Sequence, residues 1–188
     1  QRPDPDMNGP AVQKKYGPKN AGWGGGPENT EGLRIRSCPK GEDEVIAEWK
    51  PEQKYEAFPG VLNGGIIGTL LDCHCNWTAS YFLMKQAGED HPPCTVTADY
   101  AIKLLRPTPT DGPVFLSAKV VESKPDRATI EGTLSGRGKV CAACRGTLVA
   151  GTGGHPAFHR WHPRPAPPPR RPPPARRDTR PAPPRGRR

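Results

Sequence analysis

Apolar side chains change their spacing at Leu62, and this change separates strand patterns from one long helix. Before it, Glu44–Trp49 alternates between apolar and polar residues, which predicts a strand that Pro51 ends. After it, apolar residues recur every three or four positions and predict a helix that ends near Gly88. The predicted buried face consists of Leu62, Ile66, Ile67, Leu70, Leu71, His74, Thr78 and Tyr81.

The sequence beyond the helix predicts strands throughout. Alternating patterns occupy Thr95–Leu104, Val114–Val121, Ala128–Ser135 and Val140–Ala150. Gly136-Arg137-Gly138-Lys139 separates the last two and predicts a hairpin turn. One antiparallel sheet wrapped around the helix is the economical way to bury that helix, so the expected fold class is α+β.

Composition predicts two disordered segments around the domain. The sequence from 155 to 188 holds ten arginines, one aspartate and 12 of the 26 prolines, and so carries the whole net charge of +9. With almost no aliphatic residues to offset the entropy of ordering, 154–188 is expected to be disordered. The same is expected of 1–30, which is rich in Gly, Pro and Asn. The globular domain is expected at 31–153.

The Pro- and Arg-rich tail is compatible with two kinds of partner. Its Ala166–Pro174 stretch could dock on a proline-recognition module, or its arginines could bind an anionic partner such as RNA. Neither interpretation has a sequence-specific signal, and a solvated low-complexity extension is the simpler one. No apolar run reaches the roughly 20 residues that a membrane span needs, so no span is expected.

Six cysteines raise the question of a metal site. Cys73 and Cys75 would point roughly 200° apart on a helix. Cys141 and Cys144 would point to opposite faces of a strand. Neither pair could then close on one ion, so no metal and no other cofactor is expected. Reduced, buried thiols are the expected state, which suits an intracellular, reducing compartment, either the cytoplasm or an organelle.

The start of the helix carries the candidate chemistry. Gly64-Gly65 would expose backbone N–H groups at a helix N-terminus, where partial positive charge suits a developing oxyanion. Asp72 follows Asn63 by nine residues, about 2.5 turns and roughly 13 Å along a helix, so one chain cannot bring both to one reacting group. Either Asp72 is a structural acid, or two copies lie side by side and Asp72 of one faces Gly64 of the other.

The run FPGVLNGGIIGTLLD resembles the helix-start motif of hotdog acyl-CoA thioesterases of the phenylacetate-degradation type. TVTADYAIKLLRPTP and GKVCAACRGTLVAG are similar to later strands of that family, so the resemblance spans about residues 40–151. It implies the hotdog fold and hydrolysis of an acyl-CoA thioester to a free acid and CoA. It also implies a homodimer or a dimer of dimers with sites between protomers, which favours the second interpretation of the spacing.

The resemblance also implies roles for individual residues. The Gly64 N–H would polarise the thioester carbonyl, and Gly65 would bind the substrate beside it. Asp72 would act as general base on water or, as the alternative, attack the carbonyl directly. Thr97 would orient the water, although it is equally interpretable as an ordinary strand residue.

Three further residues complete the predicted site. Asn63 stands where the motif commonly has His; it can hydrogen-bond but cannot titrate near neutrality. Arg137 and Lys139 would contact the CoA phosphates, with ordinary solvated charges as the alternative. The competing functions are another hotdog activity, such as a hydratase, and a non-catalytic hotdog scaffold that acts through its Arg/Pro tail.

Overall fold

The structure is a computed structural model that describes residues 9–156. Residues 1–8 and 157–188 lie outside the described residues, and with them lies the predicted Pro- and Arg-rich tail beyond position 156. The predicted globular domain is therefore described in full, together with most of the N-terminal segment.

The central element is the helix α2, Gly64–Ala87, whose ends follow from its sequence. Asn63 has extended backbone dihedrals, and its side-chain oxygen accepts the Gly65 N–H at 2.8 Å, which caps the first turn. Gly88 ends the helix with φ 69°, in the left-handed region that favours glycine. The predicted helix is confirmed. It begins two residues after Leu62, because Leu62 belongs to a short strand.

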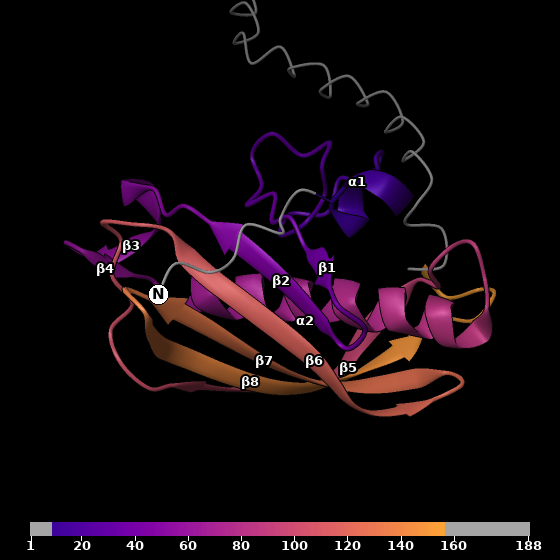
Figure 1. Cartoon of the computed structure of the whole chain (residues 1–188). Helices are drawn as coiled ribbons and strands as arrows, with labels where there is room; N and C mark the ends of the chain where they lie inside the picture. The colour runs from indigo at the N-terminus through magenta and orange to yellow at the C-terminus, as the bar shows by residue number, and fades with distance from the viewer. Residues whose placement is uncertain (1–8, 157–188) are drawn as a thin grey trace, which may run out of the picture.

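Six strands form one antiparallel sheet, and α2 lies against its concave side (Figure 1). Every predicted strand is present, and the predicted hotdog fold, an antiparallel sheet wrapped around one long central helix, is confirmed. The spatial order is β1 (Cys38–Lys40), β2 (Glu44–Trp49), β6 (Val114–Lys124), β7 (Arg127–Gly136), β8 (Lys139–Ala150) and β5 (Thr95–Leu104).

A small hairpin precedes α2 at the end of the molecule where the helix begins (Figure 1). It pairs β3 (Glu56–Phe58) with β4 (Val61–Leu62), and the short 3-10 helix η1 (Gln53–Tyr55) leads into it. A bridge between Val61 and Pro109 ties this hairpin to the connection between β5 and β6. The chain therefore enters α2 from a fixed direction.

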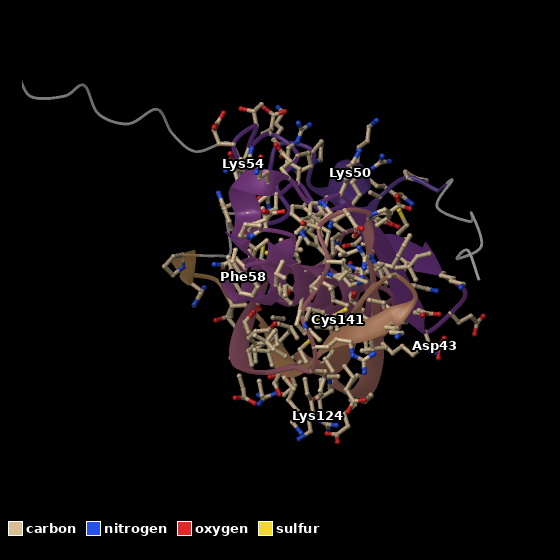
Figure 2. The ribbon with its side chains drawn as sticks, turned by 90° about the vertical axis from the view of Figure 1, so that its left-hand side faces the viewer. Asp43, Lys50, Lys54, Phe58, Lys124 and Cys141 are labelled. Atoms are coloured by element: carbon tan, nitrogen blue, oxygen red, sulfur yellow. The ribbon has the colours of Figure 1, made fainter. Side chains whose placement is uncertain are left out.

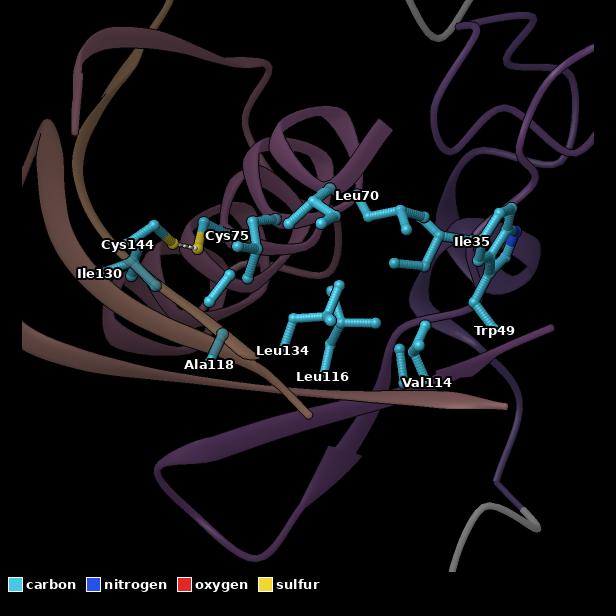
Figure 3. Close-up of a cluster of buried hydrophobic side chains, with 14 of the residues drawn as sticks. Ile35, Trp49, Leu70, Cys75, Val114, Leu116, Ala118, Ile130, Leu134 and Cys144 are labelled. Atoms are coloured by element: carbon cyan, nitrogen blue, oxygen red, sulfur yellow. Dashed lines mark hydrogen bonds between the residues drawn. The ribbon is translucent and has the colours of Figure 1, made fainter. Parts of the chain in front are cut away.

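The core fills the space between α2 and the sheet (Figure 3). Val114, Leu116 and Ala118 alternate with more exposed residues along β6, as their spacing predicts. Ile130 and Leu134 of β7 pack in the same cluster. Because successive strand residues face opposite sides, each strand contributes alternate side chains to the layer beneath the helix.

The register of the sheet shifts at three places, each leaving one residue without an opposite partner. These residues are Ala98 in β5, Val121 in β6 and Cys141 in β8. The shift at Cys141 corrects one expectation: Cys141 and Cys144 do not diverge to opposite faces, because the extra residue interrupts the alternation. Both are buried in the core cluster.

The N-terminal segment differs from the expectation of disorder for residues 1–30. Residues 9–37, here called the N-terminal strap, pack on the domain and include the helix α1 (Val12–Tyr16). A Cβ on Gly24 would collide with the Cys73 sulfur, and one on Gly25 would lie 2.8 Å from the Trp77 ring nitrogen. The strap is held by backbone packed directly on α2, which an apolar periodicity cannot reveal.

A chain of buried polar groups joins the strap to α2. The Gln13 side chain and Ser37 exchange two hydrogen bonds of 2.8 Å, and the Ser37 hydroxyl lies 2.8 Å from His74 Nδ1. His74 Nε2 lies 3.0 Å from the Val45 carbonyl oxygen on β2. His74 is therefore a hydrogen-bonded core histidine, as its place on the helix predicts.

No helix within residues 9–156 combines the length and the apolar character that crossing a membrane requires. Although α2 has 24 residues, it carries polar side chains such as His74, Asn76 and Ser80 that are buried against the protein.

Candidate active site

The first turn of α2 presents two backbone donors without an acceptor in residues 9–156, the N–H groups of Gly64 and Ile66. The Gly65 N–H is bound by the Asn63 side chain at 2.8 Å, and the Ile67 N–H reaches the Asn63 carbonyl oxygen at 3.1 Å. No acceptor within the described range pairs with the Gly64 N–H. This N–H sits at the positive end of a long helix, where an oxyanion would be stabilised. Asn63 itself serves as the helix cap.

Asp72 lies two helical turns further along α2, half-buried, and is held by the neighbouring strand. Thr97 on β5 donates its hydroxyl to the Asp72 carboxylate at 2.7 Å. The structure thus brings Thr97 and Asp72 together. It does not bring Asp72 to Gly64, because eight residues of helix separate them by about 12 Å.

The strand β5 follows α2 turn by turn along this face. Thr95 bonds the Asn76 side chain at 2.9 Å near one end, and Thr97 bonds Asp72 one turn on. The Tyr100 hydroxyl donates to the Gly68 carbonyl oxygen at 3.0 Å. At the far end, Leu104 lies against Gly64, since a Cβ there would be 3.0 Å from a Leu104 methyl.

Tyr100 is the residue of this site that the sequence interpretation missed. Simple alternation from Thr97 would turn Tyr100 away from the helix, but the extra residue Ala98 turns it inward. The Gly68 carbonyl oxygen that Tyr100 binds is also the helical acceptor for the Asp72 N–H. Burial raises the pKa of the Tyr100 phenol, so the hydroxyl stays protonated and remains a donor.

Arg137 and Lys139 lie at the same end of the molecule as Gly64. The β7–β8 turn packs on Pro109, which is bridged to Val61 just before the helix. Arg137 has φ 50° in this turn, and its guanidinium donates to Asp111, with one bond of 3.1 Å. The hydrogen bond to Arg137 lowers the pKa of the Asp111 carboxyl. Neither basic residue touches Gly64 in the protomer.

The thiols do not form a metal centre within the described part of the chain. No group of three or more His, Cys, Asp or Glu side chains in residues 9–156 is arranged to hold an ion. Cys75 of α2 and Cys144 of β8 face each other in the core with their sulfurs 3.5 Å apart (Figure 3). The contact with Cys144 and burial raise the pKa of the Cys75 thiol, which keeps it protonated.

Comparisons with known proteins place this architecture in a family. A scan against protein-family models finds no match, and a search of curated proteins finds none either. Among solved structures, the chain is similar to a thioesterase superfamily protein from Shewanella loihica PV-4, with 30% identity and a TM-score of 0.53. That match covers 63% of this chain and 91% of the other.

Two further structures share the fold at lower identity. A thioesterase from Haemophilus influenzae is 23% identical with a TM-score of 0.56, covering 65% of this chain and 84% of its own. A phenylacetic acid degradation-related protein from Ralstonia eutropha JMP134 is 19% identical with a TM-score of 0.51, covering 62% and 83%. The chain belongs to the thioesterase superfamily. Thioester hydrolysis is therefore the activity expected at the level of its family.

Proposed function

We propose that this protein hydrolyses acyl-CoA thioesters to a free acid and CoA, at two composite sites in a homodimer. The observation that carries the proposal is the arrangement along α2. An unpaired N–H at Gly64 and a strand-held carboxylate at Asp72 lie on one rigid helix, about 12 Å apart. Each is half of a hydrolytic site, and only a second copy can supply the missing half.

The proposed reaction uses each half once. The thioester carbonyl oxygen accepts the Gly64 N–H, and the helix terminus stabilises the negative charge that develops there. Asp72 of the second copy takes a proton from water, which attacks the carbonyl carbon. The carbon–sulfur bond then breaks, and the CoA thiolate leaves and is protonated. Direct attack by the Asp72 carboxylate is the alternative first step.

Thr97 and Asn63 act by positioning in this proposal. The 2.7 Å bond from Thr97 fixes one oxygen of Asp72 and leaves the other for water. Asn63 holds the first turn of α2 through its cap, which directs the Gly64 N–H outward. Capping requires no titration, so Asn is suited to this role. Gly65 preserves this cap, because a Cβ there would lie 3.1 Å from the Asn63 side-chain oxygen and press on it.

The free edge of β5 supports the homodimer. Within residues 9–156, β5 is one of the two edge strands of the sheet, and it is ten residues long and largely exposed. A long, exposed edge is a template for pairing with another strand. Because β5 runs beside α2, pairing of two such edges would bring two copies of the helix close together. Two of these dimers could assemble further into a tetramer.

Arg137 and Lys139 are proposed to contact the CoA phosphates. Their turn lies at the same end of the molecule as Gly64, which is where the substrate would enter. Arg137 would share its guanidinium between Asp111 and a phosphate, since a guanidinium offers five donors.

The test is CoA release, followed with a thiol reagent, from acetyl-, medium-chain, long-chain and aryl-acyl-CoA. We expect turnover by the wild type and a loss of at least about 100-fold in kcat for Asp72→Asn, since a general base contributes that much. Asp90→Asn, which changes an exposed aspartate beyond the end of α2, is the matched control and should retain activity. Undiminished turnover by Asp72→Asn would exclude the assigned role.

A further inference from the structure

Large apolar side chains are exposed where α2 begins. Phe58, Leu104 and Leu105 are 60%, 58% and 52% exposed, three of the six exposed large apolar residues within 9–156. Phe58 belongs to the hairpin that leads into the helix, and Leu104 ends β5. Figure 2 looks onto this end of the molecule and labels Phe58. Exposed apolar surface of this kind marks a binding site when it adjoins functional groups.

Leu104 adjoins a functional group directly. One of its methyl groups would lie 3.0 Å from a Cβ on Gly64, so it rests against the residue whose N–H has no protein partner. More than half of the side chain remains exposed despite this contact. Leu104 therefore lies beside the residue that carries the donor and offers the rest of its surface to whatever binds there.

We infer that Leu104 is a specificity-determining residue that contacts the first carbons of the acyl group and favours apolar acyl chains. The inference rests on the proposed function. In this proposal, the α- and β-carbons of an acyl group whose carbonyl oxygen is bonded to the Gly64 N–H lie against that methyl group. Each methylene that leaves water against Leu104 adds to binding. A two-carbon acyl group has too few carbons to benefit.

The chemistry of the surface favours the acyl chain over two other occupants. The CoA arm reaches a polar amide after two carbons, and a leucine side chain offers that amide no hydrogen bond. A protein segment packed on the Leu104 side chain itself would cover the neighbouring Gly64 N–H. The second copy of the proposed dimer instead pairs along the β5 edge and leaves room for the carbonyl between its Asp72 and Gly64. A hydrocarbon chain lies on Leu104 and leaves the N–H to its own carbonyl.

The test measures kcat/KM for straight-chain acyl-CoAs from acetyl to lauroyl, with wild type, Leu104→Ser and Leu104→Met. For the wild type we expect kcat/KM to rise from acetyl to octanoyl. The octanoyl-to-acetyl ratio should fall about tenfold in Leu104→Ser, because the contact with an apolar side chain is lost. Leu104→Met should keep most of the ratio. Val121→Ser, an exposed apolar position on the β6 bulge, is the control and should keep all of it.

Three results would overturn the inference while leaving the proposed function intact. They are a wild type indifferent to chain length, an equal loss on every substrate, and a change in oligomeric state of Leu104→Ser in light scattering. If the wild type hydrolyses no thioester, the proposed function fails, and the role of Leu104 is then tested by binding measurements alone. Calorimetry with octyl-CoA and ethyl-CoA thioethers should then show tighter octyl binding that Leu104→Ser loses. Equal binding of the two would also overturn the inference.

Discussion

His74 shows how one buried residue joins three parts of the chain. The Val45 carbonyl can only accept, so His74 Nε2 carries the proton and Nδ1 accepts from the Ser37 hydroxyl. The neutral ring thus has both nitrogens satisfied. A charged ring would turn Nδ1 into a donor, and the Ser37 hydroxyl, which already accepts from Gln13, would lose Nδ1 as the acceptor for its own proton. The helical period predicts that His74 is buried. Its partner Ser37 could not be predicted, because it lies in a segment without apolar periodicity.

Burial makes the stability of the protein depend on the protonation of His74. Desolvation lowers its pKa from 6.5 to about 4 in the folded state. As pH falls below 6.5, the unfolded chain binds a proton that the folded chain refuses until about pH 4, so folding loses stability. We expect the free energy of unfolding to drop by about 2 kcal/mol between pH 7.5 and 5 from this group alone.

Urea unfolding at the two pH values measures this loss. His74→Gln should lose about 2 kcal/mol less than the wild type over that interval. His91→Gln, which changes an exposed histidine, should behave as the wild type does. An equal loss in all three proteins would assign the acid sensitivity to other groups.

At the scale of elements, the pairing of α2 with β5 was predictable in part. The strand that carries Thr97 follows from the sequence, and the structure adds the contact of Thr97 with Asp72. The role of Thr97 in orienting water stays a prediction. The inward position of Tyr100 could not be predicted from the sequence. Simple alternation assigns Tyr100 to the wrong face, and no residue type near Ala98 indicates the extra residue there. A bulge is set by the pairing of two strands, so one strand's sequence does not reveal it.

Gly24 allows the N-terminal strap to pack closely on α2. We expect Gly24→Ala to lower the free energy of unfolding by about 1–3 kcal/mol, because its methyl group would collide with the Cys73 sulfur and lie 3.2 Å from a Thr69 methyl. Thermal unfolding measures the change. Gly112→Ala is the control, since nothing lies within 4 Å of a Cβ there.

Adding Cys73→Ala to Gly24→Ala should restore part of the stability, because it removes the sulfur that obstructs the new methyl group. A Gly24→Ala protein as stable as the wild type would show that the strap does not rest on α2 as closely as described.

At the scale of the whole molecule, the proposed site exists only between copies. The spacing of Gly64 and Asp72 is readable from the sequence, and the helix makes it a rigid distance. What could not be read is how two copies approach, since that depends on the shape of the exposed face of β5 and α2. A mixing experiment tests whether Gly64 of one copy and Asp72 of another form one site.

Gly64→Pro is suited to remove the proposed oxyanion donor. Proline lacks an N–H, is favoured at the first position of a helix, and needs an extended residue before it, which Asn63 provides with φ −62° and ψ 133°. Gly64→Pro and Asp72→Asn homodimers should each be inactive. Refolded together in equal amounts, they should recover about a quarter of wild-type activity, because half of the dimers carry one intact site.

Activity is measured for each variant before mixing and for the refolded mixture. When either variant is refolded alone as a control, no activity should be recovered. A mixture as inactive as its parts, with heterodimers present, would mean that Gly64 and Asp72 serve one site within one chain or no site at all.

The extra residue at Ala98 has an evolutionary consequence. Deleting it would restore strict alternation beyond Thr97, so the side chains from Tyr100 to Leu104 would exchange faces. A substitution changes one side chain, whereas loss or gain of a single codon here changes every β5 side chain that faces the start of α2. Related chains can therefore acquire a different pocket lining by one indel, and an alignment that counts positions along β5 without gaps would pair residues that face opposite sides.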